Sequence, residues 1–197
     1  MPKSLELSAY RALVRRNLPT KYTPTQDRPF GEILWLNAPE IGNALAILNL
    51  AKWLCAHRDG LSILITTKDT IKSPKPEIII DVAPSEHPHD VSAFLEHWHP
   101  TVSLWLWGAL QPNLIIATYV KGIQLIMADA DQTGFENRRD RWLPEVARDV
   151  MVCFDSVLVR SKASQARLAK LVRSGTPLEL SGPIMAGNVS LPFAQSD

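Results

Sequence analysis

The stretch GEILWLNAPEIGNALAILNLAKWLCAH, residues 31–57, decides the fold of this chain. Its first part, residues 31–38, is a short apolar run with Ile, Leu and Trp, which is typical of one buried strand. A turn-forming break follows at residues 39–43, and in residues 44–57 apolar side chains recur at close to helical spacing. Strand, Gly-containing loop and helix form the first unit of a parallel α/β sheet. Ligands bind such sheets at the loops that follow the strands, so we expect residues 39–43 to line any functional site.

Strand-like and helix-like segments alternate along the rest of the chain. Further strands are expected at residues 61–67, 78–84, 101–108, 123–130, 155–161 and 177–183. Helices are expected at residues 91–99, 111–122 and 162–175, with an exposed loop and then a helix in residues 131–154. This alternation predicts an α/β fold built on a Rossmann-like, doubly wound parallel sheet that spans residues 30–183. Residues 20–30 are expected to be a polar linker, and residues 184–197 a linker or tail.

The composition is that of an ordinary globular domain, with 46% hydrophobic and 21% charged residues in a chain of 197. A net charge of +1 creates no strong field toward nucleic acid, so we expect no nucleic-acid partner. No apolar run reaches the roughly 20 residues that a membrane span needs. Cys55 and Cys153 lie in helix-like and apolar contexts, which favours buried free thiols in a reducing compartment.

Residues 1–20 have the pattern of an amphipathic helix. The apolar residues expected on one face are Leu5, Leu7, Tyr10, Leu13 and Leu18, against Lys3, Arg11, Arg15 and Arg16. A basic amphipathic helix of this kind lies on a membrane surface or packs on its own domain. We favour packing, and keep peripheral membrane contact as the alternative.

Common catalytic motifs are missing from the sequence. The loop at residues 39–43 has a single glycine, which does not support dinucleotide binding, and there is no phosphate-binding P-loop or nucleophile elbow. Two His-x-His pairs occur, His87 with His89 and His97 with His99. The first is expected in a loop and the second at a helix end, so neither predicts a metal site.

Five segments together resemble the amino-terminal domain of 3-deoxy-D-manno-octulosonic acid (Kdo) transferases, the enzymes that add Kdo to lipid A. The family pattern Trp-x-His-Ala-x-Ser-x-Gly-Glu is similar to residues 35–43 of this chain. FLEHWHP (94–100), LWGALQPNLI (106–115), KGIQLIMADAD (121–131) and FDSVLVRSKASQARL (154–168) are similar to later family motifs, in the same order and at the same spacing. The collinearity covers residues 30 to 183.

The resemblance implies one half of a GT-B glycosyltransferase, in which two Rossmann-like domains face each other across the active cleft. The first domain receives the lipid A-type acceptor, and a carboxy-terminal domain binds the donor, CMP-Kdo. We expect this chain to be the acceptor-side half, truncated at the interdomain linker and inactive alone, with no cofactor or metal of its own. A cytoplasmic location at the inner face of the bacterial inner membrane follows from the same resemblance.

Several family positions are substituted here. Asn43 stands where the family has the Glu that resembles its general base, Asn37 replaces a histidine, Trp107 and Ala109 replace two carboxylates, and Asp131 replaces an arginine. An amide is a poor proton acceptor near neutral pH, so transfer by the family mechanism is in doubt.

Glu40 lies three residues before Asn43 in the same loop. It either serves as a relocated base or caps the following helix, and we favour the cap. Asn37, Gly42 and Asn113 are expected to contact the substrate. Asp129 and Asp131 either bind sugar hydroxyls or make a turn, and the turn is favoured.

Three hypotheses remain open at this stage. The first is a divergent Kdo transferase-like acceptor domain, and the second is a non-catalytic binding or scaffolding relative that lost its base. The third is an unrelated Rossmann-like small-molecule binder with a nucleotide near Gly42.

Overall fold

The computed structural model describes residues 4–40, 44–68, 71–131, 144–172 and 175–184. In chain order its elements are α1 (Leu5–Arg16), β1 (Glu32–Ala38), α2 (Ala44–His57), β2 (Leu61–Thr67), β3 (Ile78–Asp81), α3 (Pro88–Trp98), β4 (Val102–Leu106), α4 (Pro112–Val120), β5 (Gln124–Ala130), α6 (Pro144–Met151), β6 (Ser156–Val159), α7 (Lys162–Leu171) and β7 (Leu178–Leu180). Every segment expected to be a strand contains one, so the alternation read from the sequence is confirmed.

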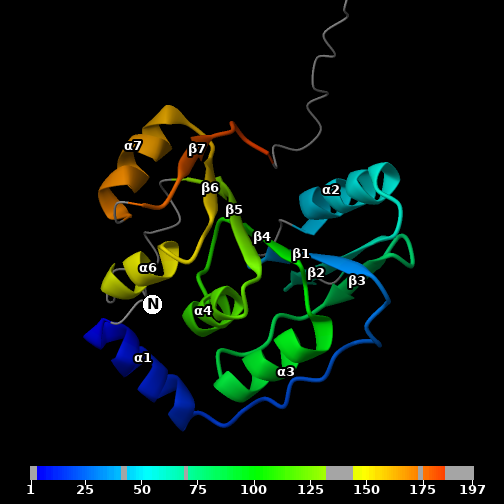
Figure 1. The fold of residues 1–197 in the computed structure, drawn as a ribbon, viewed down its shortest axis with the longest axis horizontal. Helices are drawn as coiled ribbons and strands as arrows, with labels where there is room; N and C mark the ends of the chain where they lie inside the picture. Colours follow the sequence, from blue (N-terminus) through cyan, green and yellow to red (C-terminus); the bar gives the residue numbers. More distant parts are fainter. Residues whose placement is uncertain (1–3, 41–43, 69–70, 132–143, 173–174, 185–197) are drawn as a thin grey trace, which may run out of the picture.

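The strands form one parallel, seven-stranded sheet in the order β3-β2-β1-β4-β5-β6-β7 (Figure 1). β1 pairs with β2 along its whole length, from Glu32 opposite Leu61 to Ala38 opposite Thr67. After β1 the chain moves outward to β2 and β3, and then returns to the other side of β1 as β4. The strand order therefore reverses between β1 and β4, which is the switch point of a doubly wound sheet.

Helices cover the two faces of the sheet unequally (Figure 1). Among the described helices, α2 alone packs on one face, where Ile47 and Ala51 meet Leu36 and Ile63. The helices α1, α3, α4, α6 and α7 contribute to the larger core on the opposite face. Helices on both faces of a parallel sheet confirm the doubly wound α/β architecture.

Aromatic side chains form the centre of the larger core, beneath the ends of β1 and β4. Trp35 lies 5.7 Å from Trp105 and 5.0 Å from Phe94, measured between ring centroids. The indole N–H of Trp35 donates to Thr66 Oγ1 at 2.8 Å. Replacing a buried aromatic residue by alanine typically costs about 3–5 kcal/mol, so this cluster fixes the strand ends from which the site loops emerge.

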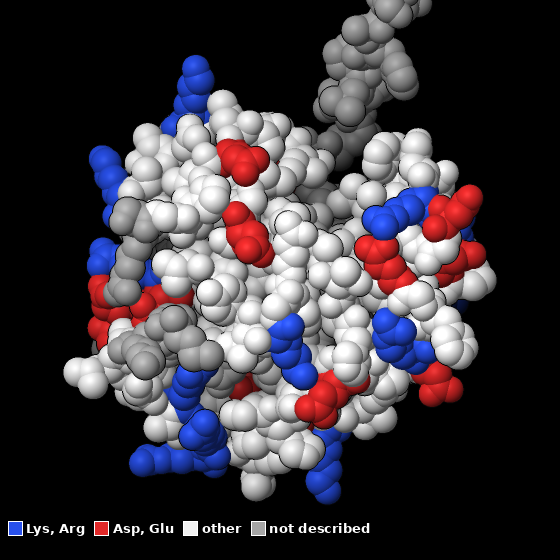
Figure 2. Space-filling model, viewed as in Figure 1, with Lys and Arg blue, Asp and Glu red and all other residues white. Residues whose placement is uncertain are grey.

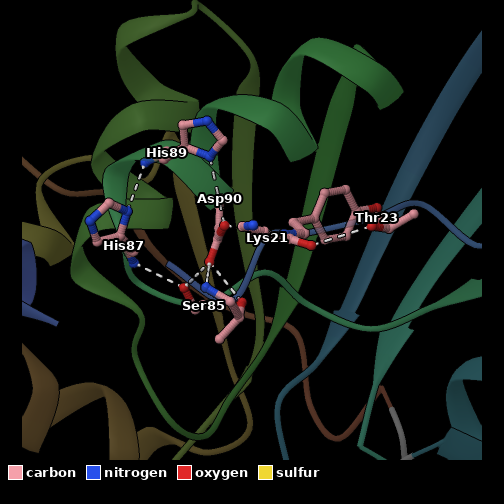
Figure 3. A network of polar contacts seen from close by, with 8 residues as sticks. Lys21, Thr23, Ser85, His87, His89 and Asp90 are labelled. Atoms are coloured by element: carbon pink, nitrogen blue, oxygen red, sulfur yellow. Dashed lines mark hydrogen bonds and ion pairs between the residues drawn. The ribbon is translucent and has the colours of Figure 1, made fainter. Parts of the chain in front are cut away.

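The segment between α1 and β1 is fastened to α3, although the sequence predicted a polar linker there. Asp90 is fully buried, and its carboxylate accepts hydrogen bonds from the backbone N–H groups of Thr20 (2.8 Å) and Tyr22 (3.1 Å) (Figure 3). It also accepts from the hydroxyls of Thr20 and Ser85, at 2.7 and 2.5 Å. Burial alone raises a carboxyl pKa, but these hydrogen bonds outweigh it and hold the pKa of Asp90 well below its usual range.

Two expectations about helices need correction. The helix expected at residues 91–99 begins at Pro88, so the expectation of a loop is wrong for His89 but holds for His87, which is the N-cap. Proline suits the first helical position, and His87 Nδ1 caps the helix by accepting the His89 N–H at 3.2 Å.

The apolar face expected for residues 1–20 is divided between core and solvent. Leu7 and Val14 enter the core, whereas Leu5, Leu13 and Leu18 are exposed. With 3.6 residues per turn, Leu5 and Leu13 lie more than about 100° around the helix from Leu7, so one face cannot hold all three. In the structure α1 packs on its own domain, as the sequence favoured.

Candidate functional site

The candidate site lies at the edge of the sheet where β1 and β4 end. The two strands are neighbours in the sheet, with Asn37 opposite Trp105. The chain leaves β1 toward α2 on one face and leaves β4 toward α4 on the other. In doubly wound sheets, ligands bind at the position from which loops diverge in this way.

Glu40 connects the loop after β1 to the loop after β4. Its Oε1 accepts the backbone N–H of Ala109 at 2.8 Å. Gly108 lies directly beside it, and a Cβ on this glycine would approach Glu40 Cγ to 2.6 Å and Pro39 Cγ to 3.1 Å. The contact between the two loops thus uses one of the two oxygens of the Glu40 carboxylate.

Asn37 lies near the end of β1, where it is only 1% exposed. Its Oδ1 accepts the hydroxyl of Thr66 at 2.6 Å. Its Nδ2 has no acceptor among the described residues, and neither has the buried indole N–H of Trp105, its partner in the register. Two adjacent buried donors without acceptors are costly, and a bound water or a ligand oxygen would satisfy them.

Asn113 stands at the start of α4, where it holds the helix in place. Its backbone N–H donates to Glu86 Oε2 at 2.8 Å, and its Nδ2 donates to the carbonyl oxygen of Glu86 at 2.9 Å. Arg11 Nε donates to its Oδ1 at 3.3 Å. These contacts use the polar atoms of Asn113 for structure, and substrate contact by this residue remains a prediction.

Asp129 and Asp131 come at the end of β5, beside the start of α7. Asp129 adopts a left-handed backbone conformation with φ 56°, and its Oδ1 accepts the N–H of Ile184 at 2.6 Å. Asp131 accepts the hydroxyl of Ser164 at 2.8 Å and lies 3.7 Å from Arg160. A positive φ on a non-glycine residue is uncommon and concentrates at turns and functional sites, so both alternatives for Asp129 stay open.

Carboxylates of the chain itself occupy several of the polar groups that the described part of this edge offers to an anion. Glu86 accepts from the first two N–H groups of α4, those of Asn113 and Leu114, since Pro112 has none. Glu40 takes the N–H of Ala109, and Asp131 lies against the capping serines of α7. Helix starts that are already neutralised do not attract phosphate, whereas carboxylates are good acceptors for the hydroxyl groups of a sugar.

The structure does not bear on every residue that the sequence singled out. Gly42 and Asn43 lie outside the described residues. Within the described parts of the chain, no group of three or more His, Cys, Asp or Glu residues is arranged to hold a metal ion. In the same parts, no helix has both the length and the apolar character needed to cross a membrane.

Glu86 was missed by the sequence reasoning, although it caps α4 and also accepts the hydroxyl of Tyr10 at 2.8 Å. The helix it caps starts 26 residues later, so no local pattern connects them. The available signal was Ser85-Glu86 directly after a strand, at the edge of the sheet where ligands bind.

Comparison with known proteins agrees with this geometry. The family model described as 3-deoxy-D-manno-octulosonic-acid transferase (kdotransferase) matches residues 12–185. A probable mitochondrial 3-deoxy-D-manno-octulosonic acid transferase of Arabidopsis thaliana is 30% identical over 100 residues, which are 48% of this chain and 22% of that protein. The 3-deoxy-D-manno-octulosonic acid transferase of Bordetella pertussis is 23% identical over 153 residues, which are 72% of this chain and 35% of that protein.

Among solved structures, the Staphylococcus aureus MnaA–UDP structure superposes with a TM-score of 0.56 at 14% identity, covering 78% of this chain and 44% of that one. At this identity the similarity concerns the fold, which is the Rossmann-like sheet of one GT-B half. The chain spans about a third or less of the curated relatives that it matches. With a family model matched over most of its length, the chain belongs to the 3-deoxy-D-manno-octulosonic-acid transferase family.

Proposed function

We propose that this chain is the acceptor-side domain of a Kdo transferase-like glycosyltransferase, which transfers a sugar from CMP-Kdo to a lipid A-type acceptor. The observation that carries the proposal is the family match over residues 12–185, which includes the loops at the ends of β1, β4 and β5. The carboxylates at this edge of the sheet fit an acceptor rich in hydroxyl groups. CMP-Kdo binds a separate carboxy-terminal domain, so the chain is inactive alone.

In this proposal Glu40 is the general base. It removes the proton from the acceptor hydroxyl through its Oε2, while the Ala109 N–H keeps the carboxylate oriented through Oε1. The acceptor oxygen then forms a bond to the anomeric carbon of Kdo, and the bond from that carbon to the phosphate oxygen breaks as CMP leaves. Groups of the donor domain stabilise the leaving phosphate.

Asn37 and Trp105 extend the acceptor site below the loops. Their two buried N–H donors have no acceptor among the described residues, and oxygen atoms of the sugar or of a bridging water supply one. The reaction takes place at the cytoplasmic face of the inner membrane, where a lipid A-type acceptor is accessible to a protein of this kind.

The second candidate is a non-catalytic binding module on the same fold. Asn43 in place of the family's glutamate favours it, because an amide cannot take the acceptor proton. Both candidates place the acceptor at the same loops, and they differ in whether a proton is removed there.

Equilibrium binding of a detergent-dispersed lipid A precursor to the 197-residue chain tests the part that the candidates share. We expect saturable binding that the variant Asn37→Leu weakens at least tenfold, since it removes one of the two buried donors that would bind the acceptor. Glu96→Gln, on the exposed side of α3, serves as the control and retains full affinity. Absence of binding, or equal affinity in both variants, contradicts an acceptor site at the ends of β1 and β4.

A further inference from the structure

The chain turns inward after its last strand. β7 is an edge strand of the sheet, and β6 lies between it and β5. The N–H of Ser181 donates to the carbonyl oxygen of Val159, the last residue of β6, at 3.1 Å. Gly182 follows with φ 75°, a left-handed conformation that favours glycine. The N–H of Ile184 then donates to Oδ1 of Asp129 in β5 at 2.6 Å. Residues 181–184 therefore cross the end of β6 and return toward the middle of the sheet.

Asp129, which receives this hydrogen bond, belongs to a bulge in β5. Met127 lies opposite Val157 of β6 and Ala130 lies opposite Val159, so β5 has two residues where β6 has one. Met127 and Ala130 are three residues apart, yet both belong to the larger core, which the two-residue period of a regular strand does not allow. Bulges are rare between parallel strands, and they redirect a side chain. The bulge thus frees the Asp129 side chain from the alternation of the strand.

The backbone of Asp129 is in the left-handed region, with φ 56°. This conformation is uncommon outside glycine, although aspartate and asparagine adopt it more readily than other residues. Such a conformation persists only where the surrounding structure holds it. Here the carboxylate accepts a charge-assisted hydrogen bond from the backbone of Ile184. The bulge, the unusual φ and the hydrogen bond together fasten the segment after β7 to the end of β5.

We propose that Asp129 is a positioning residue, which holds the chain after β7 across the end of β6 and so sets where the donor domain lies relative to Glu40. The inference rests on the proposed function in one respect, that a donor domain follows these residues in the chain. Transfer requires the acceptor oxygen and the anomeric carbon to approach within about 3–3.5 Å, so a small displacement of one domain slows the reaction strongly. Asp129 touches no reacting atom in this role.

Charge attraction is a second way of placing one domain against another, and the surface of this chain offers little of it. The net charge is only +1. In the upper part of Figure 2, where Figure 1 places α2, α7 and β7, acidic and basic side chains are mixed and form no patch of one sign. The position at which the chain leaves the sheet is therefore the stronger constraint on a following domain.

Hydrogen exchange of the Ile184 N–H in the 197-residue chain, followed by two-dimensional NMR, tests the hydrogen bond itself. D129G removes the acceptor without strain, because glycine adopts a positive φ freely, and exchange at Ile184 becomes at least about tenfold faster. D129N keeps an oxygen acceptor and a tolerated φ, so most of the protection is retained. D155A is the matched control, since Asp155 accepts the N–H of Leu125 at the start of β5 at 2.8 Å. It speeds exchange at Leu125 and leaves Ile184 unchanged.

The same variants test domain placement when the 197 residues are joined to the donor domain of a Kdo transferase. D129G lowers kcat for transfer to a lipid A precursor at least about tenfold, D129N restores most of it, and D155A retains it. Binding of the precursor to the 197-residue chain is equal for D129G and the wild type. Small-angle X-ray scattering of the joined protein without substrates gives a larger radius of gyration for D129G, because the domains are less closely held.

The proposal is overturned if Ile184 exchanges equally fast in D129G and the wild type. It is also overturned if D129G exchanges faster but keeps the kcat and the radius of gyration of the wild type. Weaker precursor binding by D129G, with kcat retained, would make Asp129 a substrate contact instead. If the joined wild-type protein shows no turnover, the proposed function fails, whereas the exchange and scattering experiments still decide on the role of Asp129.

Discussion

The contact between Gly108 and Glu40 yields the sharpest prediction, because the Glu40 side chain fills the space that a side chain at position 108 would need. Gly108 has φ 155°, and a methyl group in its place would lie 2.6 Å from Glu40 Cγ. The variant Gly108→Ala therefore strains the backbone and also displaces the Glu40 side chain, which breaks its hydrogen bond to Ala109. Glu40→Ala removes the same hydrogen bond and at the same time the atoms that the methyl group would meet.

The expected energies follow from these two effects. Placing alanine in this backbone conformation costs about 1.5 kcal/mol. The hydrogen bond between the Glu40 carboxylate and the Ala109 N–H contributes about 1.5 kcal/mol. Gly108→Ala then lowers the free energy of unfolding by about 3 kcal/mol, Glu40→Ala by about 1.5, and the double variant by about 3 and not the sum of about 4.5. The two positions are thus coupled by about 1.5 kcal/mol.

Urea unfolding of the four proteins, followed by circular dichroism, measures this coupling. Gly60→Ala is the matched control, since Gly60 also has a positive φ, of 73°, but nothing lies within 4 Å of the added methyl group. Its effect should add to that of Glu40→Ala. If Gly108→Ala and Glu40→Ala are also additive within about 0.5 kcal/mol, the loop contact described here does not hold in solution.

Three further predictions concern buried or paired polar groups. Asp90→Asn lowers the free energy of unfolding by about 2–3 kcal/mol at neutral pH. The pKa of Asp90 is depressed in the folded protein, so its carboxylate stabilises the fold above about pH 4, and this stabilisation is lost as the pH falls further. In acid, the wild-type protein and Asp90→Asn therefore approach each other in free energy of unfolding. Asp131→Arg replaces a carboxylate 3.7 Å from Arg160 by a like charge, and it lowers the melting temperature by a few degrees in calorimetry. Burial raises the pKa of the Cys153 thiol to about 11, so iodoacetamide at mildly alkaline pH labels the half-buried Cys55 well before Cys153 in mass spectra, and the reverse order would contradict the burial described.

The strand segments and the parallel α/β architecture were predictable because both depend on local patterns. Apolar runs such as residues 61–67 are long enough for a buried strand and too short for most helices, and each one became a strand. The expectation of a site at the end of β1 followed from the parallel sheet itself, and it stays a prediction.

The contacts that hold the loops together could not be predicted in this way. Glu40 accepts an N–H group 69 residues later in the chain, Glu86 accepts one 27 residues later, and Asp90 accepts one 70 residues before it. Short patterns carry no information on such partners, which depend on how the strands are ordered in space. The same is true of α1, where the helical repeat suggested one apolar face and the packing divided it in two.

The central claim is that Glu40 takes the acceptor proton. It is tested by transfer from CMP-Kdo to a lipid A precursor, with these 197 residues joined to the donor domain of a Kdo transferase. The account predicts turnover by the wild-type protein and a loss of about a hundredfold or more in kcat for Glu40→Gln, with acceptor affinity retained. Full activity of Glu40→Gln would contradict the claim. Absence of turnover in the wild-type protein, with the acceptor still bound and transfer gained by Asn43→Glu, would identify a binding module that lost its base.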